Sequence, residues 1–408
     1  MENASDGALT PFQAVCTALA ATVGTGNIAG VAGAIAIGGP GAVFWMWVSA
    51  VLGMCTKFAE VTLAVYYRET NKEGDLVGGP MYYIKNGLGK NWQFLAVLFS
   101  AFGVLTVFGT GNATQVNTIT TAVNSALLSC GLISEGAVKT SNLIQGIIIA
   151  ALVALILLGG VKRIGQVTEK LVPFMALLYI VLSVGIILFR IQALPSVIQA
   201  IFEGAFKPAA VTGGAVGSLF MSMKKGVSRG IFSNEAGLGT GSIAHACADT
   251  RKPVKQGMFG IFEVFMCTMV ICTFSAMVIL VTGTWTTGAP GSVLAINAFG
   301  TIGLIGRLVA SISLILFAAS SALSMSTSSG ILAENLLGKA ARKIMQVLVV
   351  VFCFLGGTVG VDAALPWVDV GNMIIILVHV IGIMFWVPKM RELTLDYFKR
   401  LKNGEVEA

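Results

Sequence analysis

The segment from Ala21 to Gly41, ATVGTGNIAGVAGAIAIGGPG, is as apolar as a membrane helix but rich in glycine. Glycine disfavours a helix interior by roughly 1 kcal/mol relative to alanine, and Asn27 adds a side-chain amide in hydrocarbon. A helix that unwinds at Gly24–Asn27 would free N–H groups at the start of one half and carbonyl oxygens at the end of the other. Such groups attract anions and cations respectively. The segment holds no Asp or Glu, so the backbone itself would supply this chemistry.

A second set of polar side chains lies in the apolar segment 92–126, where Asn112, Gln115 and Asn117 occur close together. Asn112 and Gln115 are three residues apart and share one face of a helix. Amides are costly at membrane depth, which favours a pocket-lining role. Gln115 would then bond a ligand and Phe108 would close over it. The alternative is a polar clasp between two helices.

The residues that most enzymes use are sparse in this chain. Its two histidines, His245 and His379, are far apart, and neither an H-E-x-x-H motif nor a pair of aspartates is present. Seven cysteines are scattered without a C-x-x-C motif, so we interpret them as packing residues. Lys57 and Glu60 are spaced for a self-contained helix pair. These patterns exclude the usual nucleophilic and metal-dependent active sites.

The elements that position these residues follow from composition. Hydrophobic residues make up 56% of the 408 positions and charged residues 11%, whereas a soluble protein carries about 25% charged residues. This predicts an all-α membrane protein. Windows of about 20 apolar residues indicate about ten transmembrane helices, at 12–37, 43–66, 92–126, 142–160, 171–189, 209–246, 256–282, 302–336, 344–361 and 366–388. The sixth and eighth are too long for one straight span, so they must be broken, tilted or extended beyond the bilayer.

The basic residues orient these spans. With cytoplasmic termini, the inner connections and the tail 389–408 carry 18 Lys and Arg, and the outer connections carry three, Lys139, Arg190 and Lys207. The positive-inside rule therefore predicts cytoplasmic termini, including a short N-terminal segment 1–11. The net charge of +7 is explained by this asymmetry, and no nucleic-acid partner is implied.

Ten spans divide into two groups of five, 12–190 and 209–388, joined by an outer connection at 191–208. Because five is odd, the halves would point in opposite directions, as in inverted-repeat transporters with discontinuous helices 1 and 6. Glycines weaken both first members, at 24–33 and 213–230. We place the second break near Gly217 to Met221, facing the first, with Glu235 paired to Arg229. The alternative is that glycine only allows close helix packing.

Four motifs, spread over both halves of the chain, carry a family resemblance that covers nearly the whole chain from Thr10 on. GTGNIAGVAGAIAIGGPGAVFWMW, KFAEVTLAVYYRE, KKGVSRGIFSNEAGLGTGSIAHACAD and FGTGNATQVNT resemble motifs of the alanine or glycine:cation symporter family, the sodium:alanine symporters. VGTGN is also similar to a motif of sodium-coupled neurotransmitter-type symporters of the LeuT fold. The chain departs from the family in lacking the usual hydrophobic span ahead of G-T-G-N, and in having Met325 where the family usually has tryptophan.

The resemblance implies a sodium-coupled symporter that imports small neutral amino acids, alanine and glycine, by alternating access. A proton-coupled or uncoupled carrier on the same scaffold is the alternative. No enzymatic activity and no cofactor beyond the coupling ion are implied. The expected partners are the amino acid, Na⁺ and the lipid bilayer, for a multi-pass monomer in the plasma membrane.

Residues carried over from the family patterns form two sets. The expected substrate-binding residues are Thr22, Gly24, Thr25, Gly26, Asn27, Phe108, Asn112, Gln115, Ser218, Met221 and Met325. One sodium ion would bind the Thr22 carbonyl and the Asn27 side chain. A second would bind the carbonyls of Ala20 and Val23 and the hydroxyls of Ser320 and Ser321, unless these serines only bond neighbouring helices.

Overall fold

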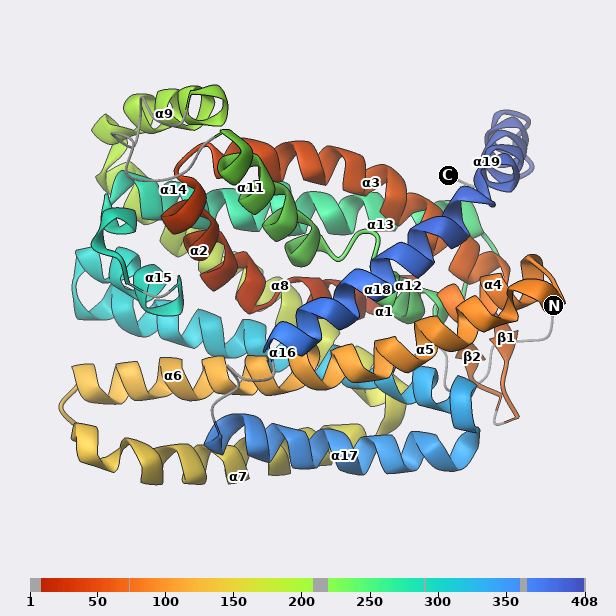
Figure 1. Cartoon of the computed structure of the whole chain (residues 1–408), viewed down its shortest axis with the longest axis horizontal. Coiled ribbons are helices and arrows are strands. Elements are labelled where there is room, and N and C mark those ends of the chain that lie inside the picture. The colour runs from red at the N-terminus through yellow and green to blue at the C-terminus, as the bar shows by residue number, and fades with distance from the viewer. Residues whose placement is uncertain (1–8, 73, 208–218, 290, 360–364, 407–408) are drawn as a thin grey trace.

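The computed structural model describes residues 9–72, 74–207, 219–289, 291–359 and 365–406, which are almost entirely helical. Seven of the described helices are long and apolar enough to cross a membrane, or nine if each of two bent helix pairs is one span. Their positions match the segments that hydrophobicity predicts. The helices run mostly along the long axis of the molecule, with α6, α7 and α17 at one side and α3 and α13 at the other (Figure 1).

Several of the long helices are continuous. They are α3 (Ala42–Tyr66), α7 (Val138–Leu157), α8 (Gly160–Phe189), α16 (Leu304–Leu337), α17 (Lys339–Thr358) and α18 (Leu365–Met384). The 34 residues of α16 rise about 51 Å at 1.5 Å per residue, well beyond a hydrocarbon core of about 30 Å. The eighth predicted span is therefore one extended helix without a break.

The first span breaks where its glycines predict. Helix α1 (Pro11–Thr22) begins with a capping box in which Thr10 and Gln13 exchange hydrogen bonds of 3.1 Å. It ends at Thr22, a single 3₁₀ turn η1 (Thr25–Asn27) follows, and α2 (Ala29–Gly38) leaves at an angle of 61°.

The sixth span breaks at a different place from the predicted one. Helix α11 (Leu219–Asn234) is continuous, so the prediction of a break reaching Met221 is wrong in its described part, and Gly217 and Ser218 lie outside the described residues. The break comes before α12 (Thr240–Ala246), where Glu235, Gly237 and Gly239 have φ values of 53°, 98° and 78°. Left-handed backbone stops a helix more decisively than glycines in helical conformation, which explains the difference.

Two other spans contain a π-helical segment. The third runs through α5 (Gln93–Phe108), η3 (Gly109–Ala113) and α6 (Thr114–Ser129), and the seventh through α13 (Pro253–Val264), η6 (Phe265–Cys272) and α14 (Thr273–Val281). The segment η3 contacts α16, and the segment η6 contacts the turn η1 of the first span. A π turn adds a residue and rotates the faces that follow it, and such turns are frequent at functional sites.

The short elements lie at the two ends of the bundle. The hairpin β1 (Glu69–Thr70) and β2 (Leu76–Val77), helix α4 (Pro80–Gly87) and helix α19 (Val387–Lys402) gather at one end, and α9 (Leu194–Phe206) and α15 (Gly291–Phe299) at the other (Figure 1). The connection 68–90 and the basic tail helix thus share an end, as expected if both face the same compartment.

Candidate functional site

A small cavity of about 30 Å³ lies at the breaks of the first and sixth spans. Because one water needs roughly 10–15 Å³ of such space, the cavity has room for about two or three waters. Its walls come from span 1, the third span, the second break and helices α16 and α18. The lining residues are Ala21, Thr22, Gly24, Gly26, Asn27, Thr106, Val107, Gln115, Phe232, Glu235, Leu238, Thr240, Met325 and Asn372.

Many of the residues predicted from sequence meet at this cavity. Six of them line it, namely Thr22, Gly24, Gly26, Asn27, Gln115 and Met325. Thr25 is adjacent, because its N–H donates to Gln115 Oε1 at 3.4 Å. The amide of the third span and the unwound backbone of the first span therefore belong to one polar wall.

Asn27 holds the first break in place. Its Oδ1 accepts the Gly24 N–H at 2.9 Å, which closes the 3₁₀ turn over the side chain. Its Nδ2 donates to Ser233 Oγ at 3.0 Å and to the Cys267 carbonyl at 3.3 Å. The fully buried side chain thus joins span 1 to α11 and to the π segment η6.

Ser321 lies against the end of α1. Its hydroxyl donates to the Ala20 carbonyl at 2.9 Å and lies 3.3 Å from the Ala21 carbonyl oxygen. A Cβ on Gly24 would come within 2.4 Å of Ser321 Oγ, so only glycine permits this approach. Oxygen atoms from the end of α1 and from α16 are therefore brought together.

The other groups predicted to bind sodium are engaged in hydrogen bonds with other partners. Ser320 donates to the Phe317 carbonyl at 2.9 Å and lies 3.4 Å from Met175 Sδ. The Thr22 carbonyl accepts the Cys267 thiol at 3.4 Å. The Val23 N–H donates to the Leu19 carbonyl at 2.7 Å and completes the last turn of α1.

Comparison with known proteins decides the family. All 408 residues match the sodium:alanine symporter family. The chain belongs to this family. It is 37% identical to the sodium/alanine symporter AgcS of Methanococcus maripaludis, over 94% of this chain and 83% of that one. It is 43% identical to the probable sodium/glutamine symporter GlnT of Bacillus subtilis, over 68% of this chain and 54% of that one.

A solved structure shares the fold. The crystal structure of MhsT in complex with L-phenylalanine aligns with a TM-score of 0.62 at 15% sequence identity, over 97% of this chain and 99% of that one. This confirms the all-α, LeuT-type membrane fold. Membership of a transporter family also confirms that the protein is a transporter and not an enzyme.

Three residues that the sequence assigned to the substrate lie elsewhere in the described structure. Phe108 packs against Phe352, with 4.5 Å between ring centroids, and lines a separate apolar groove. Asn112 donates to the Val349 carbonyl at 2.8 Å and accepts the Cys353 thiol at 2.9 Å, which forms a clasp to α17. Met221 is in the first turn of α11, outside the cavity wall. The π segment η3 explains the case of Asn112, because it alters the face that Asn112 would share with Gln115.

Sequence reasoning missed eight residues of the transporter's cavity wall, two of which are the apolar Ala21 and Val107. Phe232, Glu235, Leu238 and Thr240 flank or form the second break. The motif SNEAGLGTG, which directly follows Phe232, was visible in the sequence, but only Glu235 was singled out, as a partner of Arg229. Thr106 and Asn372 complete the wall, and their sequence surroundings gave no signal. Asn372 Oδ1 is buried and forms no hydrogen bond within the described part of the chain.

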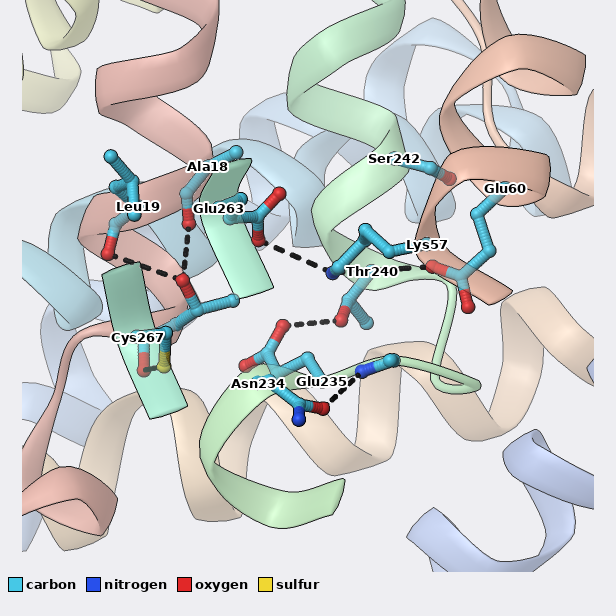
Figure 2. A network of polar contacts seen from close by, with 12 residues as sticks. Ala18, Leu19, Lys57, Glu60, Asn234, Glu235, Thr240, Ser242, Glu263 and Cys267 are labelled. Atoms are coloured by element: carbon cyan, nitrogen blue, oxygen red, sulfur yellow. Dashed lines mark hydrogen bonds and ion pairs between the residues drawn. The ribbon is translucent and has the colours of Figure 1, made fainter. Parts of the chain in front are cut away.

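Of the two predicted ion pairs, Lys57–Glu60 is present but not self-contained, and Glu235–Arg229 is not found among the described contacts. Lys57 lies 3.2 Å from Glu263 Oε1 on α13 and 3.9 Å from Glu60 Oε2, so its nearer partner is not on its own helix (Figure 2). Glu235 bonds Thr240 Oγ1 at 2.6 Å, whereas the predicted partner Arg229 lies over the Phe232 ring at 5.4 Å. In both cases the packing of α12 and α13 brings in a group that sequence spacing cannot reveal.

Proposed function

We propose that this transporter is a sodium-coupled symporter that imports small neutral amino acids, alanine and glycine foremost, by alternating access. The observation that carries the proposal is the first break at Gly24–Asn27, which borders the cavity and lies beside Ser321. This arrangement joins a site for a zwitterion to a site for a cation. Coupling follows if each occupant stabilises the geometry that the other needs.

The cavity suits both ends of a small amino acid. The lining residues Gly26 and Asn27 lie just before α2, whose first N–H groups have no partner within that helix and lie at its positive dipole end, which favours a carboxylate. The buried oxygens of Asn372 and Glu235 line the same cavity and favour an ammonium group. A volume of about 30 Å³ means that even alanine requires some side-chain movement, and large side chains require far more.

The proposal keeps the two sodium sites that the resemblance implies. The carbonyls of Ala20 and Val23 with the hydroxyl of Ser321 would hold one ion, and Ser320 would join them by changing its rotamer. The Thr22 carbonyl and Asn27 Oδ1 would hold the other. Hydroxyl and carbonyl oxygens are the ligands that hard cations prefer.

Met325 sets the breadth of the substrate class. It is 7% exposed and lines the cavity beside Val107 and Ala21. Methionine is flexible and adapts to different neighbours, so the pocket accepts neutral amino acids slightly larger than alanine. Competition of unlabelled neutral amino acids with labelled alanine would rank their affinities for the pocket.

We place the protein in the plasma membrane as a monomer with both termini cytoplasmic. The basic residues Arg68, Lys85 and Lys389 belong to the connection and tail helix that share one end of the bundle (Figure 1). Large exposed side chains such as Leu155, Leu177 and Val347 would face lipid. We also propose that the membrane helices form two groups of five, at 12–190 and 209–388.

Transport by purified protein in liposomes tests the function. We expect labelled alanine to accumulate when an inward sodium gradient is imposed, and to stay near background with potassium on both sides. A proton-coupled or uncoupled carrier predicts equal uptake without sodium, and that result would overturn the sodium coupling. Empty liposomes supply the background.

A further inference from the structure

A group of ionisable side chains lies beside the cavity inside the helix bundle. Its charged members are Lys57 and Glu60 on α3, Glu235 at the second break and Glu263 on α13. Three of these side chains have no exposed surface, and Glu235 is 7% exposed. Ionisable residues at membrane depth are costly and usually functional, yet the proposed sodium and substrate sites leave most of this group unused.

The group contains one positive charge. Lys57 Nζ lies 3.2 Å from Glu263 Oε1 and 3.9 Å from Glu60 Oε2. Gly241 permits this contact, because a Cβ there would meet Lys57 Nζ at 2.7 Å. Glu60 Oε1 accepts the Gly237 N–H at 2.5 Å, which ties the group to the second break.

Two buried histidines border the group, and the hydrogen bonds of both fit the neutral form. Gln256 Nε2 donates to His245 Nδ1 at 2.8 Å, so His245 carries its proton on Nε2, 3.0 Å from Glu263 Oε2. His379 donates from Nδ1 to the Gly237 carbonyl at 2.7 Å and accepts the Tyr83 hydroxyl at Nε2. With neutral histidines, three carboxylates face a single lysine.

Such an excess of negative charge away from water is unfavourable, so a carboxylate takes up a proton. Glu263 is stabilised as an anion by both Lys57 and His245. Glu60 has Lys57 nearby and one backbone donor, although its Oε2 forms no hydrogen bond within the described chain. Glu235 bonds only the Thr240 hydroxyl among the described contacts, and a hydroxyl can accept as well as donate.

We propose that Glu235 is a proton-binding residue of the cavity. It holds a proton as a neutral carboxylic acid that donates to Thr240 Oγ1, and it exchanges that proton with water when the cavity opens. Protonation turns the carboxylate into the acid, and water supplies or accepts the proton, so no other bond changes. That this exchange occurs during transport rests on the proposed function. The titratable groups of the cluster around Glu235 are Lys57, Glu60 and Glu263, which Figure 2 labels, and His245, His379 and Tyr83, which contact its members or one another.

Infrared spectroscopy of the purified full chain at pH 7, without sodium or amino acid, tests the proton directly. We expect the C=O stretch of a protonated carboxylic acid, shifted in D₂O, to disappear in Glu235→Gln. The matched control is Glu334→Gln, because Glu334 pairs with Arg342 at 3.0 Å and lies outside the cluster. Absence of this signal from the wild type, or its survival in folded Glu235→Gln, would overturn the proposal.

A second pair of variants decides the matter if Glu235→Gln does not fold, as judged by size-exclusion chromatography. Thr240→Val removes the acceptor, so the C=O stretch should move to the higher frequency of a free acid, and Thr240→Ser should restore it. An unchanged frequency in Thr240→Val would contradict the proposal. These measurements require no transport, so their failure and the failure of sodium symport are distinguishable.

Discussion

The two breaks that meet at the cavity are built from different chemistry. The first uses small neutral residues in a 3₁₀ turn, closed by the Asn27 amide on the Gly24 N–H. The second uses three left-handed residues, Glu235, Gly237 and Gly239, and its backbone bonds buried side chains from α3 and α18. The first break therefore offers backbone groups and the second offers titratable side chains.

This difference indicates a division of tasks between the first and the second break. Backbone dipoles do not titrate, so the proposed binding of a carboxylate and sodium at the first break should depend little on pH. A side-chain carboxyl changes its charge with its proton, so the second break responds to pH. The structural requirements differ too, because close approach fixes Gly24 and left-handed backbone fixes Gly239.

The largest effect on function is expected at the first break. In Gly24→Ala the new methyl would overlap Ser321 Oγ, whereas a Cβ on Gly33 meets nothing within 4 Å. Gly24→Ala should lower sodium-driven alanine uptake at least about a hundredfold, equivalent to ~3 kcal/mol of lost binding. Gly33→Ala should retain uptake close to wild type in the same liposome assay. Similar uptake by both variants would show that transport does not require the close approach of Gly24 and Ser321.

A large effect on stability is expected at the second break. Left-handed backbone costs alanine roughly 1–2 kcal/mol, and a Cβ on Gly239 would also lie 2.4 Å from Pro80 Cγ and 2.8 Å from His379 Cε1. Gly283 has a similar φ of 70° but open space around it. Thermal melting in detergent should therefore show a clearly larger loss for Gly239→Ala than for Gly283→Ala. Equal losses would mean that the second break is no more tightly packed than an outer loop.

The smallest effect concerns sodium itself. Ser321→Ala removes the hydroxyl 2.9 Å from the Ala20 carbonyl, whereas Ser320 bonds within its own helix. Because a bond to a charged partner is worth ~1.5–3 kcal/mol, Ser321→Ala should raise the sodium concentration for half-maximal uptake roughly tenfold. We expect a smaller shift for Ser320→Ala, measured as uptake against sodium concentration. A larger shift for Ser320→Ala would reverse the assignment of the main ligand.

Prediction from sequence succeeded where a signal was local. The G-T-G-N string correctly marked the break between α1 and α2, because consecutive weak helix formers act within a single turn. The second break was misplaced because glycines at 213–230 weaken a helix on average, whereas φ at Glu235 and Gly239 is set by contacts with other spans. Asn112 was assigned to the pocket for a similar reason, since its clasp depends on α17.

The sequence by itself determined that the chain is a bundle of membrane helices, with the first span broken at Gly24 and Asn27. Hydrophobicity and helix propensity are properties of short windows, so composition is sufficient for such conclusions. Only the tertiary structure decided that Glu235 borders the cavity, that Lys57 pairs with Glu263, and that Asn372 completes the wall. These contacts join spans that are far apart along the chain, and packing within the membrane chooses them.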